Sequence, residues 1–261
     1  VTMSFYVEPI VRDLRTFSGR DRYDLSTLRT GTGAPLTRDS FRWLVEDLGA
    51  EHLTNVYGLS ETSNACCRSM WNDPLEDRIE TCGWPMPDVR IRVADPETDR
   101  DLGTNEMGEI QVNAYTVTPG YYKLPNETAA AMTADGWLKT GDLGVIRDDG
   151  QLLFRGRHQD MIKPGGFNVA TLEVENFIKN IPGVREVAVV GVPDERWGQR
   201  VAAVAQPRPG ASVTLEDLDL HCRKSLAGYK VPRELHLVDQ VRRSEAGKPD
   251  YRWAKSVATA D

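Results

Sequence analysis

The stretch "LFRGRHQDMIKPGGFNVATLEVE", residues 153–175, separates two segments that both have the pattern of regular structure. It combines a charged link, poor in helix formers, with Lys163 and the adjacent glycines Gly165 and Gly166. A glycine pair weakens a strand interior, and a lysine is rarely buried without a partner, so this stretch does not fit a domain core. We expect the polar link to be a hinge between two domains.

The residues up to about position 75 have the pattern of an α/β domain. A helical pattern begins at residues 7–14. "STLRTG" (residues 26–31) is predicted to be a short strand that leads into the glycine loop "TGTGAPL" (residues 30–36). A helix that ends at Gly49 follows, and "HLTNVYG" (residues 52–58) is a second strand. Ligands bind at the carboxyl ends of strands in open α/β sheets, so these two loops are predicted to form the base of a ligand-binding site.

Residues 81–156 change to a β-rich pattern. "DVRIRVAD" and "GEIQVNA" alternate between apolar and polar residues, and Asp149-Gly150 is a hairpin turn signal. We expect a small distorted barrel or sheet in this region.

Residues 160–261 have the pattern of a compact α+β domain. A helix is expected over residues 171–180, with Glu173 and Glu175 near its positive end. The other predicted elements are the strands "EVAVVGV" (186–192), "RVAAVAQ" (200–206) and "ELHLV" (234–238) and a helix within residues 214–228.

Composition excludes several classes of protein. The chain has 261 residues, of which 40% are hydrophobic and 27% charged, and a net charge of −7 with acids and bases interspersed. This argues against disorder, against a nucleic-acid surface and against a basic membrane-binding face. No apolar run is long enough for a membrane span, no signal peptide is recognised, and the four cysteines lack metal-ligand spacing. We expect a reduced, cytoplasmic protein.

Two short motifs could carry chemistry at strand ends. "NVYGLSET" (residues 55–62) offers Tyr57 as an exposed aromatic that could stack on a base, Ser60 for a phosphate oxygen and Glu61 for Mg²⁺. An ordinary turn with a surface glutamate is the alternative. In "GWLKTGDLG" (residues 136–144) Asp142 could accept both hydroxyls of a ribose, or it could cap its own turn.

A third candidate lies in "RSEAGKPDYRW" near the end of the chain. Lys248 follows a glycine there and has Arg242, Arg243 and Arg252 nearby in sequence. It is either part of a solvated basic tail or a mobile cation that neutralises charge on a transferring phosphoryl or carboxylate group.

The order of five motifs resembles the adenylate-forming superfamily of acyl- and aryl-CoA synthetases, luciferases and peptide-synthetase adenylation domains. They are "NVYGLSET", "GEIQV" with "GYYKLPNET", "GWLKTGDLG", "GRHQDMIKPGGFNVATLEVE" and "AGKPDYR". The resemblance covers the whole chain but only the second half of the family's fold. It implies an open α/β sheet plus a small β-barrel over residues 1–156, the end of a large domain, and a mobile α+β domain over residues 157–261.

Members of this family convert a carboxylic acid and ATP to an acyl-adenylate and pass the acyl group to a thiol. The resemblance implies that Ser60, Glu61 and Lys248 are catalytic and that Glu61 holds Mg²⁺. It implies a hinge at Gln159 and a coenzyme A tunnel lined by Gly165 and Gly166. The nucleotide-binding residues that it implies are Gly33, Ala34, Pro35, Asn55, Tyr57, Gly58, Asp142, Arg157 and Lys163.

The sequence also departs from the family pattern. Gln159 replaces the usual acid or lysine, Ala170-Thr171 replaces a polar or aromatic residue and a proline, and Pro249 replaces an aliphatic residue. The loop ending in Pro-Lys-Gly that holds the β- and γ-phosphates is absent, so we expect this chain to work with an N-terminal half.

Three hypotheses remain open at this point. The first is an acyl-CoA ligase that uses ATP, Mg²⁺, coenzyme A and a small carboxylic acid. The second is an enzyme that catalyses only thiol transfer from a preformed adenylate, motivated by Gln159 and Pro249. The third is a non-catalytic nucleotide-binding module, which the presence of Glu61, Asp142, Arg157 and Lys248 disfavours.

Overall fold

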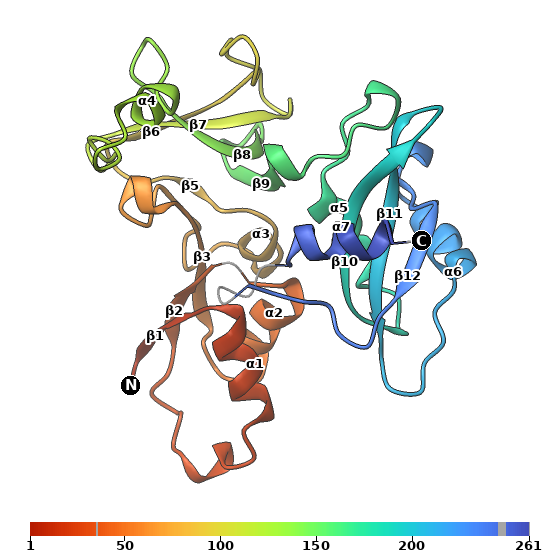
Figure 1. The fold of residues 1–261 in the computed structure, drawn as a ribbon. Coiled ribbons are helices and arrows are strands. Elements are labelled where there is room, and N and C mark those ends of the chain that lie inside the picture. Colours follow the sequence, from red (N-terminus) through yellow and green to blue (C-terminus); the bar gives the residue numbers. More distant parts are fainter. Residues whose placement is uncertain (35, 245–248, 261) are drawn as a thin grey trace. The chain divides into compact units, whose positions relative to one another are not determined.

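The structure, a computed structural model of the chain, describes residues 1–34, 36–244 and 249–260. The chain divides into two compact units, Val1–Phe154 (unit 1) and Arg155–Asp261 (unit 2) (Figure 1). Each unit has its own sheet structure and its own buried core, and each is described by itself.

Unit 1 begins with a five-stranded sheet in the order β1-β2-β3-β4-β5. The first three strands are parallel, and β4 and β5 continue the sheet antiparallel. The strands are β1 (Met3–Tyr6), β2 (Thr30–Gly33), β3 (His52–Tyr57), β4 (Cys67–Arg68) and β5 (Trp84–Pro85). Its helices are α1 (Glu8–Thr16), α2 (Arg38–Glu46) and α3 (Leu75–Glu80).

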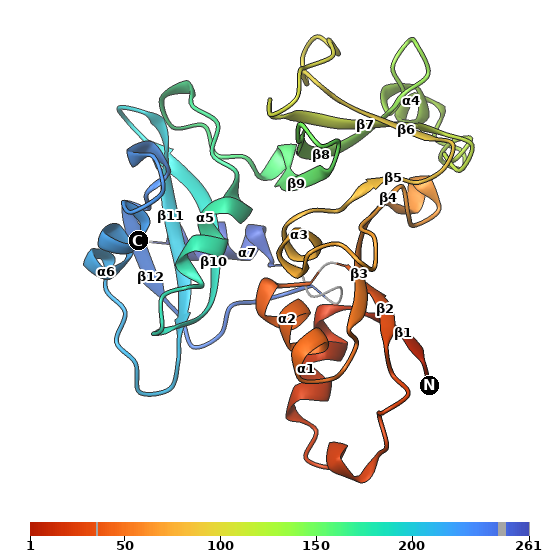
Figure 2. The same cartoon turned by 180° about the vertical axis from the view of Figure 1, so that it is seen from behind.

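The helices α1 and α2 lie on the same side of this sheet in both views (Figure 1; Figure 2). Val11 of α1 and Phe41 and Leu44 of α2 are buried together with Leu53 of β3 in one apolar cluster. The apolar stripe of each helix therefore packs that helix against the parallel strands that lead to the predicted ligand-binding site.

The start of the chain differs from the predicted pattern. Met3–Tyr6 is the strand β1, and the helix begins only at Glu8, after the extended residue Val7. The predicted strand at residues 26–31 is also displaced, because β2 runs from Thr30 to Gly33 and takes in most of the predicted glycine loop. Parallel pairing with β1 explains the displacement: a Cβ on Gly31 would lie 2.3 Å from the Ser4 carbonyl oxygen, so glycine permits this close approach.

The β-rich region forms a four-stranded sheet in the order β6-β7-β8-β9. Its strands are β6 (Val89–Ala94), β7 (Gly108–Ala114), β8 (Leu138–Ile146) and β9 (Leu152–Arg157), with α4 (Pro125–Ala130) between β7 and β8. The expectation of a small barrel is wrong: among the described strands β6 and β9 stand at opposite ends of the order, and four strands are too few to close around a filled interior.

Unit 2 is an α+β domain around a three-stranded sheet in the order β10-β11-β12. Its strands are β10 (Val184–Asp194), β11 (Gly198–Pro207) and β12 (Glu234–Leu237), and its helices are α5 (Thr171–Ile178), α6 (Leu215–Cys222) and α7 (Tyr251–Ala258). The first two strands are antiparallel and β12 is parallel to β11.

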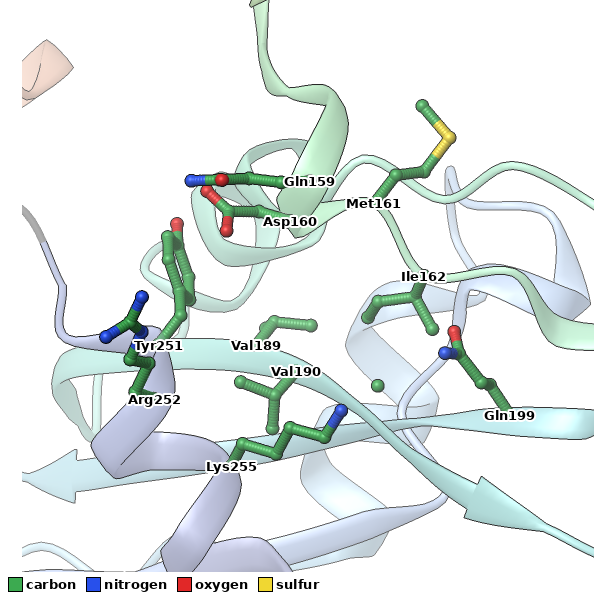
Figure 3. Close-up of a pocket in the computed structure, with 11 residues that line it drawn as sticks. Gln159, Asp160, Met161, Ile162, Val189, Val190, Gln199, Tyr251, Arg252 and Lys255 are labelled. Atoms are coloured by element: carbon green, nitrogen blue, oxygen red, sulfur yellow. The ribbon is translucent and has the colours of Figure 1, made fainter. Parts of the chain in front are cut away.

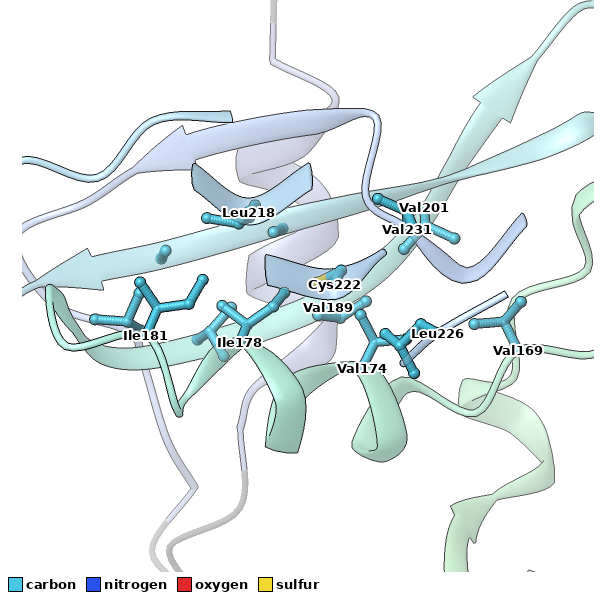
Figure 4. Close-up of a cluster of buried hydrophobic side chains, with 14 of the residues drawn as sticks. Val169, Val174, Ile178, Ile181, Val189, Val201, Leu218, Cys222, Leu226 and Val231 are labelled. Atoms are coloured by element: carbon cyan, nitrogen blue, oxygen red, sulfur yellow. The ribbon is translucent and has the colours of Figure 1, made fainter. Parts of the chain in front are cut away.

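Both faces of this sheet are covered. Val187 and Val189 of β10 face the cluster formed with α5 and α6, which includes Ile178 and Leu218 (Figure 4). The alternate residues of β10 face a second cluster, which includes Ala254 of α7. Burial on both faces explains why this strand is apolar at nearly every position.

Three details of unit 2 differ from the sequence-based expectation. Glu175, expected near the positive end of its helix, is fully buried in the core, and α6 ends at Cys222, earlier than expected. The helix α7 was not predicted: its buried positions Ala254 and Ala258 are small, and its larger apolar residues Trp253 and Val257 are only partly buried.

The remaining short elements are 3-10 turns: Arg20–Arg22, Ser60–Thr62, His158–Asp160, Pro164–Gly166 and Gly228–Lys230. None of the helices in the described parts of the chain is long and apolar enough to cross a membrane.

Candidate active site

The loop after β3 presents Ser60 and Glu61 in a 3-10 turn. The Thr62 hydroxyl closes this turn, since it accepts from the Leu59 amide at 3.0 Å and donates to the Leu59 carbonyl at 3.1 Å. Gly58 allows the chain to pack tightly at the base of the loop, because a Cβ there would lie 2.1 Å from the Asn64 carbonyl oxygen. The loop is therefore a defined turn that keeps both candidate catalytic side chains at the end of β3.

Tyr57, the last residue of β3, contacts Asp142 directly. Its hydroxyl donates to Asp142 Oδ2 at 2.9 Å, and its ring lies 5.9 Å from that of Phe154 between centroids. Only 7% of Tyr57 is exposed, so the expectation of an exposed aromatic is wrong in this structure. Burial, and then the negative charge of Asp142, raise the pKa of the Tyr57 hydroxyl, which stays a donor at neutral pH.

Asp142 lies within β8 and is 3% exposed. Its backbone N–H donates to Thr140 Oγ1 at 3.1 Å, so the Thr140 side chain caps this turn. A buried carboxylate needs hydrogen-bond donors, and the Tyr57 hydroxyl is one of them. The structure therefore brings together two candidate residues that are 85 positions apart.

Glu61 contacts a residue that the sequence analysis did not single out. The Tyr121 hydroxyl donates to Glu61 Oε1 at 2.9 Å, and the Thr118 amide donates to the Glu61 carbonyl at 2.7 Å. The hydrogen bond to Glu61 raises the pKa of Tyr121. The only sequence signal was the position of Tyr121 in "GYYKLPNET", a motif quoted above without an assigned role.

A single carboxylate such as Glu61 suits Mg²⁺, which proteins commonly hold with one or two carboxylates and the phosphates of the substrate. Within the described residues there is no group of three or more histidine, cysteine, aspartate or glutamate side chains that could form a metal site made by the protein alone.

The other nucleotide-binding candidates of unit 1 lie along β2 and β3. Gly33 pairs with Asn55 in the parallel ladder, and the Ala34 amide donates to the Tyr6 carbonyl at 3.2 Å. The Asn55 side chain donates to the Thr81 carbonyl at 2.9 Å, so its amide braces the backbone. Pro35 lies outside the described residues.

In unit 2, Arg157 is the exposed last residue of β9, and Gln159 lies in the turn His158–Asp160. Gln159 and Tyr251 line an open cavity of about 290 Å³ between this turn, β10 and α7 (Figure 3). The cavity also has Arg252 and Lys255 on its wall, so the hinge candidate lies beside polar and charged groups of its own unit. Lys248 lies outside the described residues.

Gly165 and Gly166 belong to the 3-10 turn Pro164–Gly166, which Lys163 directly precedes. Lys163 is exposed, and its amide donates to Gln199 Oε1 at 2.8 Å. Gly165 and Gly166 have φ angles of 57° and 83°, which favour glycine. A Cβ on Gly165 would lie 2.6 Å from Cε3 of Trp197, whereas one on Gly166 would meet nothing within 4 Å.

Comparison with known proteins adds two family matches. The family model described as "AMP-binding enzyme" matches residues 1–122, and the one described as "AMP-binding enzyme C-terminal domain" matches residues 173–248. The two matches fall in different units.

Similar proteins are longer than this chain. The mitochondrial medium-chain acyl-CoA ligase ACSF2 of Bos taurus is 32% identical over 87% of this chain and 37% of its own length. The fatty acid–[acyl-carrier-protein] ligase ScoC of Streptomyces coeruleorubidus is 34% identical over 95% of this chain and 48% of its own length. The crystal structure of ATP-bound MatB from Rhodopseudomonas palustris, 30% identical, has a TM-score of 0.85 over 98% of this chain and 50% of that one. The chain thus spans half or less of these relatives.

Proposed function

Because this chain belongs to the adenylate-forming superfamily of AMP-binding enzymes, we propose that the protein containing it activates a carboxylic acid with ATP and transfers the acyl group to coenzyme A. The single observation that carries the proposal is the buried Tyr57–Asp142 pair at the end of β3. A carboxylate in that position can accept both hydroxyls of a ribose, as acidic residues do in other nucleotide sites.

In the first half-reaction, a carboxylate oxygen of the acid attacks the α-phosphorus of ATP, and pyrophosphate leaves. Asp142 would hold the ribose, the Tyr57 hydroxyl would keep the Asp142 carboxylate in place, and Glu61 would hold Mg²⁺, which would neutralise phosphate charge when bound. Ser60 would face the phosphates. Lys248 would neutralise the charge that develops between the acid and the α-phosphate, an interaction that acts most strongly in the transition state.

In the second half-reaction, the thiol of coenzyme A attacks the acyl carbonyl, and AMP leaves. Gly166 supports this step, because its α-carbon has open space around it and a side chain there would project into that space. We propose that Gly165 and Gly166 line the path of the thiol and that unit 2 turns about Gln159 between the half-reactions. Hinge rotations of this kind are common in enzymes with two active poses.

The proposal is tested by measuring the two half-reactions separately in the complete enzyme. Lys248→Ala should abolish ATP–pyrophosphate exchange but keep thioester formation from a preformed acyl-adenylate, and Gly166→Leu should do the reverse. Lys224→Ala, which removes an exposed lysine of unit 2, is the matched control. Equal loss of both steps in each variant would contradict the two-pose mechanism.

The same assays separate the alternatives. Exchange by the wild-type enzyme with a suitable acid excludes an enzyme limited to thiol transfer, and AMP binding without turnover of any acid would favour a binding module. The acceptor also needs a direct test, since the relative from Streptomyces coeruleorubidus is named for an acyl carrier protein and not for coenzyme A. Thioester formation with coenzyme A alone supports the proposal, and formation only on a carrier protein contradicts it.

A further inference from the structure

The ladder between β7 and β8 contains a bulge where Asp142 is presented. The regular pairs on either side of it are Glu109 with Leu143 and Gln111 with Lys139. Between these pairs a single β7 residue, Ile110, stands opposite the three residues 140–142. Bulges disrupt ladder hydrogen bonds and often re-aim a side chain beside a functional site. Gly141 has a φ of 69°, so the chain turns sharply just before Asp142.

Side chains take over the hydrogen bonds of this bulge. Glu109 Oε1 accepts from the Gly141 amide at 2.9 Å. Thr140 Oγ1 donates to the Ile110 carbonyl at 2.6 Å and accepts from the Asp142 amide at 3.1 Å. A hydrogen bond from a backbone N–H to an ionised carboxylate is stronger than one to a neutral acceptor. Glu109 therefore holds the residue that directs Asp142.

Glu109 is itself fixed in place. It is 6% exposed, and Gln111 Nε2 donates to its Oε2 at 3.4 Å. The same Gln111 amide donates to Asp99 Oδ1 at 2.8 Å, and Lys139 Nζ lies 2.9 Å from that oxygen. This chain of polar contacts restricts the Glu109 carboxylate to one orientation, with its second oxygen on the Gly141 amide.

We propose that Glu109 is a positioning residue for nucleotide binding, a proposal that rests on the ribose-binding role proposed for Asp142. Glu109 does not touch the nucleotide. It holds the Gly141 amide, keeps the left-handed turn closed, and thereby keeps the Asp142 carboxylate beside the Tyr57 hydroxyl. Without it, Asp142 remains present but its carboxylate no longer has one fixed direction, so binding of ATP weakens more than binding of the acid.

The test compares three variants of the complete enzyme in ATP–pyrophosphate exchange. Glu109→Ala is expected to raise the KM for ATP roughly tenfold, the range for a lost hydrogen bond to a charged group, and to change the KM for the acid by less than about twofold. Glu109→Gln keeps an oxygen that can accept from Gly141 and is expected to recover most of the loss. The control is Glu106→Ala, which removes an exposed carboxylate from the loop before β7, outside this chain of contacts, and is expected to leave the KM for ATP unchanged.

A second variant tests the proposal if Glu109→Ala folds poorly. Thr140→Val keeps Glu109 but removes the hydroxyl that closes the other side of the bulge, and it is expected to raise the KM for ATP in the same way. Equal effects of Glu106→Ala and Glu109→Ala would overturn the proposal. So would parallel rises in the KM values for ATP and for the acid, or normal ATP binding by both Thr140→Val and Glu109→Ala. Absence of exchange and of AMP binding in the wild type would instead refute the proposed function.

Discussion

Glu175 offers the sharpest prediction about stability, because it is a fully buried carboxyl group in the core of unit 2. Its Oε1 accepts from the Val189 amide of β10 at 3.0 Å. Burial raises the pKa of Glu175 to about 7, although the charge of Lys179, the Val189 amide, the Tyr251 hydroxyl and the charge of Arg243 all favour the ionised form. The folded unit therefore holds a proton that an exposed glutamate would lose.

The sign and size of the effect follow from this difference. Between pH 4.5, the ordinary pKa of the group, and about 7, the folded state keeps the proton and the unfolded state does not. Unfolding then releases a proton, so the free energy of unfolding falls as the pH rises through this range. Each pKa unit corresponds to ~1.4 kcal/mol, which gives a loss of about 3 kcal/mol in total.

Glu175→Gln removes the titrating group but keeps an oxygen that can accept from the Val189 amide. We expect wild type and variant to unfold with similar free energies at pH 5, and the variant to be more stable by about 2 kcal/mol at pH 8, after part of the gain is lost to incomplete pairing of the new amide. Urea titrations should be followed by deuterium uptake of peptides from β10, because these amides report on unit 2 alone. Other titrating groups cancel in the comparison between the two proteins.

Two outcomes would refute this reasoning. In the first, the difference in free energy of unfolding between wild type and Glu175→Gln is the same at pH 5 and at pH 8. The pKa of Glu175 would then not differ between the folded and unfolded states. If the variant is less stable at pH 8, the ionised form of Glu175 is stabilising, and its surroundings compensate for burial more fully than we infer.

Three further predictions test packing and the site. Ile178→Ala should lower the free energy of unfolding of unit 2 by about 2–5 kcal/mol in the same urea titration, because the side chain is fully buried. Gly83→Ala should destabilise unit 1 in thermal unfolding, since Gly83 has a φ of 72° and a Cβ would lie 2.1 Å from the Arg68 carbonyl oxygen. Tyr121→Phe should raise the Mg²⁺ concentration needed for half-maximal exchange about two- to tenfold, because Glu61 loses the hydroxyl that orients it; an unchanged Mg²⁺ requirement would contradict this role.

The sequence predicts elements best where one period of apolar residues dominates. The strand expected at residues 186–192 lies inside β10, and the helix expected from residue 171 is α5 (Thr171–Ile178). Prediction from the sequence fails where pairing with a distant segment decides whether a residue lies in a strand or in a loop. The glycines of β2 suggest a loop by composition, but they form a strand because they let β1 approach closely.

The candidate site shows the same limit. The motifs identified Tyr57, Glu61 and Asp142 as residues with a possible shared role, but they contained no information on which side chains touch. The contact between Tyr57 and Asp142 depends on a bulge in β8, and the contact of Glu61 with Tyr121 depends on a loop that returns from a separate motif. Local periodicity cannot encode such contacts, because they join segments that are distant in the chain.

Asp142 and Glu175 show why a buried acid has to be judged by its surroundings and not by its motif. Both are carboxyl groups buried within the motifs that resemble the family, and both pack near a tyrosine. Asp142 follows a bulge in an antiparallel ladder, where other side chains supply the hydrogen bonds, and it contacts Tyr57 at the end of the parallel strand β3. Glu175 lies on the inner side of α5 against a β10 amide, where burial outweighs the groups that favour its ionised form. We propose that the first arrangement directs a carboxylate toward a ligand, whereas the second removes a charge from a core. We therefore expect substitution of Asp142 to change nucleotide binding, and substitution of Glu175 to change the pH dependence of stability.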